Sequence, residues 1–256
     1  MEYPSLEMLF FLIGAGFLAA FIDSIVGGGG LISLPALLFA GLPPVFGLGT
    51  NKLGGTMSSL TSTGSFLMSK KGNMKLALCL FPLSFIGAIL GTYTVKQIPS
   101  DFLKPLVVCM LIVVTIYTLF KKNWGVTSTY NGLTTKTVTL LVIGALAIGF
   151  YDGFFGPGAG SFLIFLFLMV GFDFVGASAN AKVLNLASNV ASLGTFFLMK
   201  SVNYYYGLPM GIAMIFGALV GSQVAIRKGS TFVKPLFVFV TLLLVGKQVW
   251  TLVFHA

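Results

Sequence analysis

A motif in the first half of the chain returns in the second half, and this internal duplication restricts the fold more than any other feature. Residues 21–55 read FIDSIVGGGGLISLPALLFAGLPPVFGLGTNKLGG, and residues 150–185 read FYDGFFGPGAGSFLIFLFLMVGFDFVGASANAKVLN. In each copy an apolar run carries one acidic residue, Asp23 or Asp152, and then meets a glycine cluster. Each such glycine costs a helix about 1 kcal/mol relative to alanine. We therefore expect both helices to break there.

The duplication extends over almost the whole chain. At a shift of 129 residues Asp23 matches Asp152, Gly27 matches Gly156 and Gly29 matches Gly158. At a shift of 130 residues the matched pairs are Gly41 and Gly171, Lys52 and Lys182, Ser58 and Ser188, Gly64 and Gly194, Gly87 and Gly217, and Gly91 and Gly221. We expect one membrane domain with a first repeat at 1–121, a linker at 122–137 and a second repeat at 138–256.

The composition indicates an integral membrane protein. Of the 256 residues, 57% are hydrophobic and 8% are charged, and the mean hydropathy is +1.01. That leaves too little polar surface to cover a soluble domain. Several apolar runs are long enough to cross a hydrocarbon core of about 30 Å as helices, and the alternating pattern of a membrane β-barrel is absent. The net charge of +9 is spread over the ends of apolar runs, which favours membrane topology over nucleic-acid binding.

The fold class we predict is an all-α polytopic membrane protein with about five helical segments per repeat. The short second segment of each repeat follows the glycine-rich break. The first repeat is predicted to have helices near 6–26, 30–41, 51–68, 75–96 and 102–121. The second is predicted to have helices near 138–155, 160–171, 180–199, 207–226 and 232–252.

Lysine placement favours an inverted arrangement of the two repeats. Five crossings per repeat place nine loop cations on one side and three on the other, whereas four crossings, with the short helix re-entrant, divide them seven to five. Because cations gather in cytoplasmic loops, five crossings and inverted repeats are preferred. Both termini are then expected outside the cytoplasm and the linker inside it.

The acidic residue, the glycine-rich break, the proline-bearing short helix and the GTNK sequence ending at Lys52 together resemble the sulfite exporter TauE/SafE family of membrane permeases. The resemblance covers nearly the whole chain. The second copy departs from it, with SANAK ending at Lys182 in place of GTNK, and Pro157 in place of a glycine. The resemblance implies transport of small sulfur-containing anions, such as sulfite or organosulfonates, driven by an ion gradient, in the inner membrane of a bacterium.

The residues themselves also suit an anion. Short helices that begin after glycine clusters present free amides and positive dipole ends; the alternative is that the glycines only allow close helix packing. Lys52 and Lys182 each place a cation at the start of a third helix, where it faces water, a partner or substrate, or extends to the membrane surface. Asparagines add amide donors, or bond neighbouring helices. The candidate substrate-binding residues are Gly29, Gly30, Asn51, Lys52, Gly158, Gly160, Asn180, Lys182 and Asn185.

Asp23 and Asp152 are the candidate proton-coupling residues. A carboxyl group in a dry cavity can bind and release a proton during transport. Alternatively, a carboxylate that caps the glycine amides or pairs with a lysine stays ionised and has a structural role. The fuller glycine cluster and the GTNK sequence of the first copy favour Asp23 as the proton carrier.

No motif for chemistry stands out, so we expect no enzyme activity, no catalytic residue, no cofactor and no metal site. The polar loops are too short for an ATP-hydrolysing domain. A secondary transporter is the preferred interpretation and a passive anion channel the alternative, with a membrane-embedded enzyme third. The expected partners are a small anion and the lipid bilayer, with no nucleic acid. The sequence leaves the oligomeric state and the coupling ion open.

Overall fold

The computed structural model of the chain describes residues 4–95 and 125–233, together with 235, 236, 238, 239, 242 and 246. The prediction of an all-α protein is confirmed for these residues. Their helices are α1 Leu6–Val26, α2 Gly30–Phe39, α3 Pro44–Ser69, α4 Met74–Thr94, α6 Thr135–Phe154, α7 Ala159–Met169, α8 Phe174–Leu198 and α9 Tyr204–Lys228. The predicted helix at 102–121 and most of the one at 232–252 lie outside the described residues.

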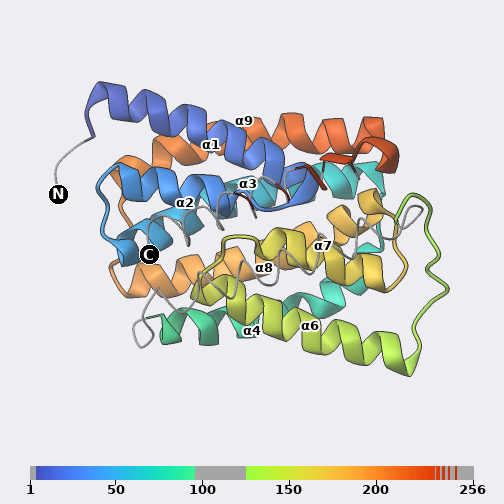
Figure 1. Cartoon of the computed structure of the whole chain (residues 1–256). Helices are drawn as coiled ribbons and strands as arrows, with labels where there is room; N and C mark the ends of the chain where they lie inside the picture. The colour runs from blue at the N-terminus through green and yellow to red at the C-terminus, as the bar shows by residue number, and fades with distance from the viewer. Residues whose placement is uncertain are drawn as a thin grey trace.

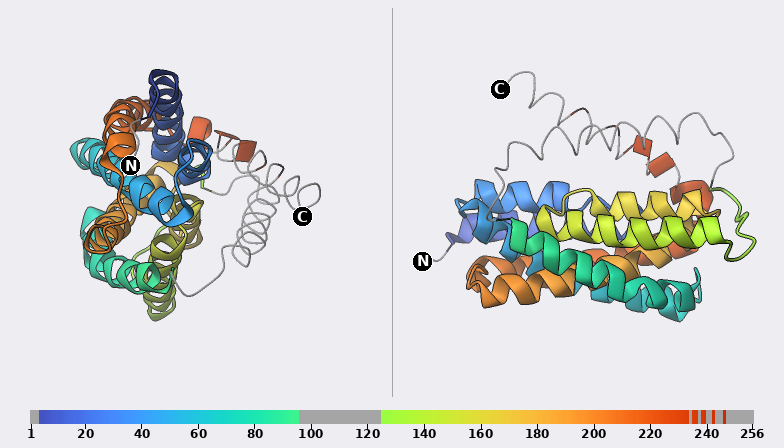
Figure 2. Two further views of the ribbon diagram at one scale, coloured as in Figure 1. Left: turned by 90° about the vertical axis from the view of Figure 1, so that its left-hand side faces the viewer. Right: turned by 90° about the horizontal axis from the view of Figure 1, so that it is seen from below.

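The long helices lie alongside one another in a single bundle (Figure 1), which Figure 2 shows end-on and from below. α1 packs against α9 along one side, and α4 packs against α6 along the other. α3 and α8 lie between these two pairs and contact each other. The short helices α2 and α7 complete the middle layer.

Among the described residues, four helices, α1, α4, α6 and α9, are long and apolar enough to cross a membrane. They carry exposed apolar side chains such as Phe10, Ile143 and Phe216, which suit contact with lipid. α3 and α8 have 26 and 25 residues but are more polar. Because the outer helices shelter them from lipid, they can carry lysine, asparagine and serine inside the bundle. The prediction of an integral membrane protein is confirmed.

The third helix of each half begins earlier than the sequence suggested. We predicted starts at 51 and 180, but α3 begins at Pro44 and α8 at Phe174. Proline is favourable at the first position of a helix because its missing N–H would have no partner there. The Asp173 side chain accepts a hydrogen bond from the Gly176 amide at 3.2 Å and so caps α8. Lys52 and Lys182 consequently lie about two turns inside their helices, not at the starts.

Both predicted helix breaks are confirmed. α1 ends at Val26 and α2 begins at Gly30, while α6 ends at Phe154 and α7 begins at Ala159. Gly27 and Gly28 have φ angles of 76° and 86°, a region that other residues rarely adopt. α2 and α7 have 10 and 11 residues, so they rise only about half of a 30 Å hydrocarbon core.

The two breaks touch each other in the middle of the bundle. A side chain added at Gly27 would overlap the Gly160 and Ser161 backbone. Gly30 lies near Pro157, whose Cα would be 3.2 Å from an added Cβ. The glycines therefore bring the ends of four helices to one point.

The fourth helix of each half packs against the first helix of the other half: α4 against α6, and α9 against α1. A side chain at Gly91 of α4 would overlap the Phe150 backbone in α6, and one at Gly221 of α9 would overlap the Phe21 backbone in α1. Small residues allow this close approach, as is common between membrane helices. The central helices α3 and α8 run antiparallel: the Thr63 hydroxyl donates to the Lys182 carbonyl oxygen, while Gly55, earlier in α3, lies against Asn189, later in α8.

Candidate functional site

Two buried ion pairs cross between the halves of the chain. Lys52 Nζ on α3 lies 2.6 Å from Asp152 Oδ1 on α6, and Lys182 Nζ on α8 lies 2.5 Å from Asp23 Oδ2 on α1. Each lysine thus pairs with the acidic residue of the other half, directly beside a helix break. The sequence showed that these four residues are equivalent in pairs, but not that they meet crosswise.

Asp152 is fully enclosed by donors. Besides Lys52, its Oδ2 accepts hydrogen bonds from Asn185 Nδ2 at 3.1 Å and from Ser188 Oγ. The side chains of Lys52 and Asp152 are only 3% and 4% exposed. A buried charge with three charge-compensating or hydrogen-bonding partners is held in one place.

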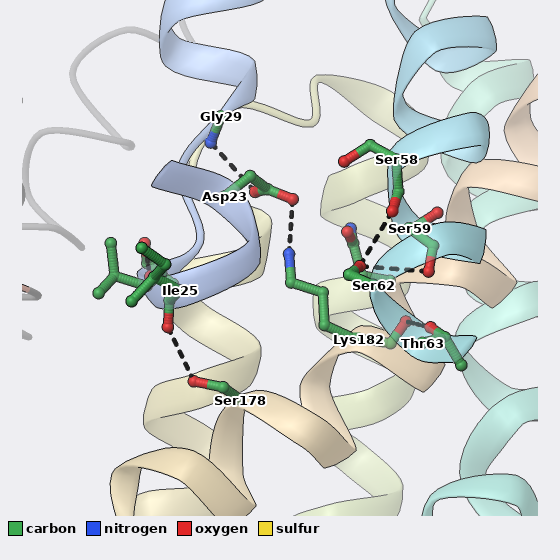
Figure 3. Close-up of polar contacts among 12 residues, drawn as sticks. Asp23, Ile25, Gly29, Ser58, Ser59, Ser62, Thr63, Ser178 and Lys182 are labelled. Atoms are coloured by element: carbon green, nitrogen blue, oxygen red, sulfur yellow. Dashed lines mark hydrogen bonds and ion pairs between the residues drawn. The ribbon is translucent and has the colours of Figure 1, made fainter. Parts of the chain in front are cut away.

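Asp23 has fewer partners and is more exposed. Its Oδ1 accepts a hydrogen bond from the Gly29 amide at 3.1 Å, at the start of α2 (Figure 3). Its other oxygen accepts from Lys182, which is 1% exposed, while the Asp23 side chain is 17% exposed. A helix N-terminus favours a negative charge, so this carboxylate occupies the position where an anion is also expected to bind.

A small cavity of about 40 Å³ lies where the two breaks meet. One buried water needs roughly 10–15 Å³, so this space has room for a few waters. Its lining combines polar residues with glycines: Asp23, Ser33, Asn51, Lys52, Asp152, Asn185, Asn189 and Met214, and Gly28, Gly29, Gly30, Gly55, Gly156, Gly158 and Gly160.

Most of the predicted site residues line this cavity. They are Asp23, Gly29, Gly30, Asn51, Lys52, Asp152, Gly158, Gly160 and Asn185. Lys182 lies behind the wall and reaches the cavity only through Asp23. Asn180 lies elsewhere: its Oδ1 accepts from the Asn73 amide at 2.8 Å and holds the turn between α3 and α4.

Several cavity residues were missing from the predicted site. Ser33 Oγ on α2 lies 2.6 Å from Asn51 Oδ1 and fixes the orientation of that amide. A single serine in a short apolar helix is the signal that could have identified it. Asn189 lies one turn beyond Asn185, and this helical spacing already placed both on one face of α8. Met214 comes from α9, and nothing in its surrounding sequence indicates the contact.

The charges around the cavity sum to zero, because two lysines face two aspartates. The asparagine amides and the N-terminal ends of α2 and α7 add partial positive charge. Such a cavity can hold a small anion only if its lysines and carboxylates redistribute their contacts.

The chain matches the family model described as "Sulfite exporter TauE/SafE" over residues 12–247. A protein of Sinorhizobium sp, named "Probable membrane transporter protein ORF9", is 41% identical over 95% of this chain and 93% of its own length. The chain therefore belongs to the sulfite exporter TauE/SafE family.

Other relatives match the chain over nearly its full length. A "Probable membrane transporter protein" of Haemophilus influenzae is 35% identical over 96% of both chains. The Escherichia coli protein "Probable membrane transporter protein YfcA" is 34% identical over 96% of this chain and 90% of its own length. No solved structure matches the chain. The protein is a membrane transporter, integral to the bacterial inner membrane.

Proposed function

We propose that this TauE/SafE protein is a secondary transporter of a small sulfur-containing anion, such as sulfite or an organosulfonate, coupled to a proton gradient. The observation that carries the proposal is the cavity between the two helix breaks, which has Lys52 in its wall and Lys182 directly behind Asp23. The family name supports the class of anion, and the geometry supports this cavity as its binding place.

The cavity provides the contacts that an oxyanion needs. The backbone at Gly29 and Gly30 begins α2, and the backbone at Gly158 and Gly160 lies at the start of α7. Helix N-termini bind oxyanions through their backbone N–H groups and their positive dipole ends. The Asn51 and Asn185 side chains add amide groups from the two central helices.

Proton coupling follows from charge balance. An anion that enters a neutral, buried cavity introduces net negative charge, which is costly in a medium of low dielectric constant. Protonation of Asp23 removes one negative charge, releases Lys182 from its counter-ion and frees the Gly29 amide. One proton per negative charge of the anion keeps the cavity neutral. Asp152 has three donors, so Asp23 is the carboxylate that we assign to proton exchange.

Inverted repeats would give this transporter its alternating access. The antiparallel course of the equivalent helices α3 and α8, and the crossed contacts of α1 with α9 and α4 with α6, support that arrangement. Exchange of conformations between the halves then exposes one cavity to each side in turn. Reporter fusions at Lys71, Asn123 and Ala256 test it. A cytoplasmic signal at Ala256 would replace the inverted arrangement with a parallel one.

A passive anion channel is the alternative function. The small size of the cavity and the direct contact of Gly27 with Gly160 favour an occluded binding site over an open pore. A channel gives flux that does not saturate at low concentration and does not respond to pH. A coupled transporter gives flux that saturates and follows an imposed proton gradient.

Binding to purified protein tests the proposed substrate class. Sulfite, a panel of sulfonates, sulfate and small carboxylates are titrated against the protein by calorimetry. We expect saturable binding of sulfite or a sulfonate, which Lys52→Met weakens and which Lys136→Ala, a change at an exposed lysine of α6, leaves unchanged. Equal affinity for every anion in both variants, or no binding at all, would refute the proposal.

A further inference from the structure

One buried hydroxyl of α3 has no hydrogen-bond partner in the described part of the chain. It belongs to Ser58, which is 1% exposed. Figure 3 shows its hydroxyl on the side of α3 that faces Asp23 and Lys182. Buried hydroxyl groups in proteins are nearly always bonded, and an unbonded one requires an explanation.

The duplication supplies the explanation, because Ser58 is equivalent to Ser188. Ser188 Oγ donates a hydrogen bond to Asp152, the carboxylate of the enclosed ion pair. The same hydroxyl in the first half would donate to Asp23, but it does not in this conformation. The duplication thus predicts a contact that the structure lacks.

The remaining partners of the two carboxylates differ in the same way. Asp23 accepts a hydrogen bond from the Gly29 amide. Among the described residues, the amide of the equivalent Gly158 does not donate to Asp152. Asp152 instead accepts from its lysine and from two side chains of α8. Equivalent carboxylates therefore have two different environments, one bonded to a helix N-terminus and one bonded to a central helix.

We propose that Ser58 is a positioning residue that donates to Asp23 in the opposite-facing conformation of the transporter. When the halves exchange conformations, Asp23 leaves the Gly29 amide and bonds Ser58, while Asp152 leaves Ser188 and approaches the Gly158 amide. The inference rests on the exchange of halves in the proposed function. It adds a residue pair, Ser58 and Ser188, that sets the balance between the two conformations.

The two serine-to-alanine changes should then shift the ratio of the two conformations in opposite directions. Ser188→Ala removes a hydrogen bond of the present conformation, and Ser58→Ala removes one of the opposite conformation. One such bond changes the ratio of two conformations by about three-fold to ten-fold. The double variant should return close to the wild-type ratio, because the two losses cancel.

Cysteine labelling can measure this ratio without any substrate. Val175 near the start of α8 is 3% exposed, whereas the equivalent Val45 near the start of α3 is half-buried. Phe46 is also half-buried and lines an open cavity at the α2–α3 turn, whereas the equivalent Gly176 is buried. A cysteine at 175 should react with an impermeant maleimide in the opposite conformation, and a cysteine at 46 in the present one.

The experiment uses the full chain in lipid nanodiscs, with Cys79→Ser and Cys109→Ser and either Val175→Cys or Phe46→Cys. Only monodisperse protein is labelled. We expect Ser58→Ala to slow labelling at 175 by about three-fold to ten-fold and Ser188→Ala to accelerate it by a similar factor. The labelling rate at 46 should rise in Ser58→Ala and fall in Ser188→Ala. Ser58→Thr and Ser188→Thr keep the hydroxyl and should label at the wild-type rates.

Alanine variants that leave both labelling rates unchanged, or that shift them in the same direction, would overturn the inference. A double variant that adds the two effects instead of cancelling them would also do so. Sulfite binding is measured separately on the same samples. Bound sulfite without the opposed labelling pattern refutes the inference alone, and the opposed pattern without anion binding refutes the proposed substrate.

Discussion

The two ion pairs occupy equivalent positions in the two halves, yet only one of them is closed. Asp152 accepts from Lys52, Asn185 and Ser188, and its side chain is 4% exposed. Asp23 accepts from Lys182 and from one backbone amide, and its side chain is 17% exposed. In this conformation three side chains hold Asp152, whereas one side chain and one backbone amide hold Asp23.

The different hydrogen-bond partners of Asp23 and Asp152 depend on individual residues that the two halves do not share. Asn185 has Gly55 as its equivalent, so the first half lacks a side-chain amide at that position. The glycine amide that bonds Asp23 belongs to the start of α2. Two similar halves can thus hold their equivalent carboxylates in different surroundings without changing either charged residue.

The largest expected effect is on folding, and it separates the two carboxylates. Asp152→Asn leaves Lys52 buried without a counter-ion, which costs about 3–5 kcal/mol. Asp23→Asn also leaves a buried lysine, Lys182, without its counter-ion, but it should cost less, because the Asp23 side chain is 17% exposed and that of Asp152 only 4%. The measurement is the fraction of monodisperse protein that remains after heating. Equal losses in the two variants would show that the pairs are energetically alike.

The next effect is on anion affinity and separates the two lysines. Lys52 lines the cavity and Lys182 does not, so Lys52→Ala should weaken binding by about ten-fold to more than a hundred-fold, the loss of one charge-assisted contact. Lys182→Ala should weaken it less. Calorimetric titration of folded protein decides between them. Unchanged affinity in both single variants and in the double variant would remove both lysines from the site.

A smaller loss of anion affinity is expected when Ser33, another cavity residue, is changed. Ser33→Ala removes the hydroxyl that orients Asn51 and should weaken anion binding by about two-fold to ten-fold, with little loss of stability. Ser69→Ala, which removes a local bond to Phe66 at the end of α3, is the matched control. If the control weakens binding equally, the effect does not come from the cavity.

The sequence predicted the parts of the site better than their arrangement. Glycine clusters and the acidic residues before them identified both helix breaks, because the cost of glycine in a helix is a local property. The pairing of Lys52 with Asp152 depends on packing between segments about a hundred residues apart, which no local pattern records. The start of α3 was predicted too late, because Pro43 and Pro44 were assigned to a loop rather than to a helix N-terminus.

Proton carriage by Asp23 is the central claim, and flux in proteoliposomes tests it most directly. Sulfite uptake, or uptake of whichever sulfonate binds best, is measured at several imposed pH gradients for wild type, Asp23→Asn and any Asp152→Asn protein that folds. We predict that Asp23→Asn keeps anion binding but that its flux no longer follows the pH gradient, whereas Asp152→Asn has a low folded yield and the surviving protein stays coupled. Full coupling in Asp23→Asn would contradict the claim, and full coupling in both variants would exclude proton carriage by either carboxylate.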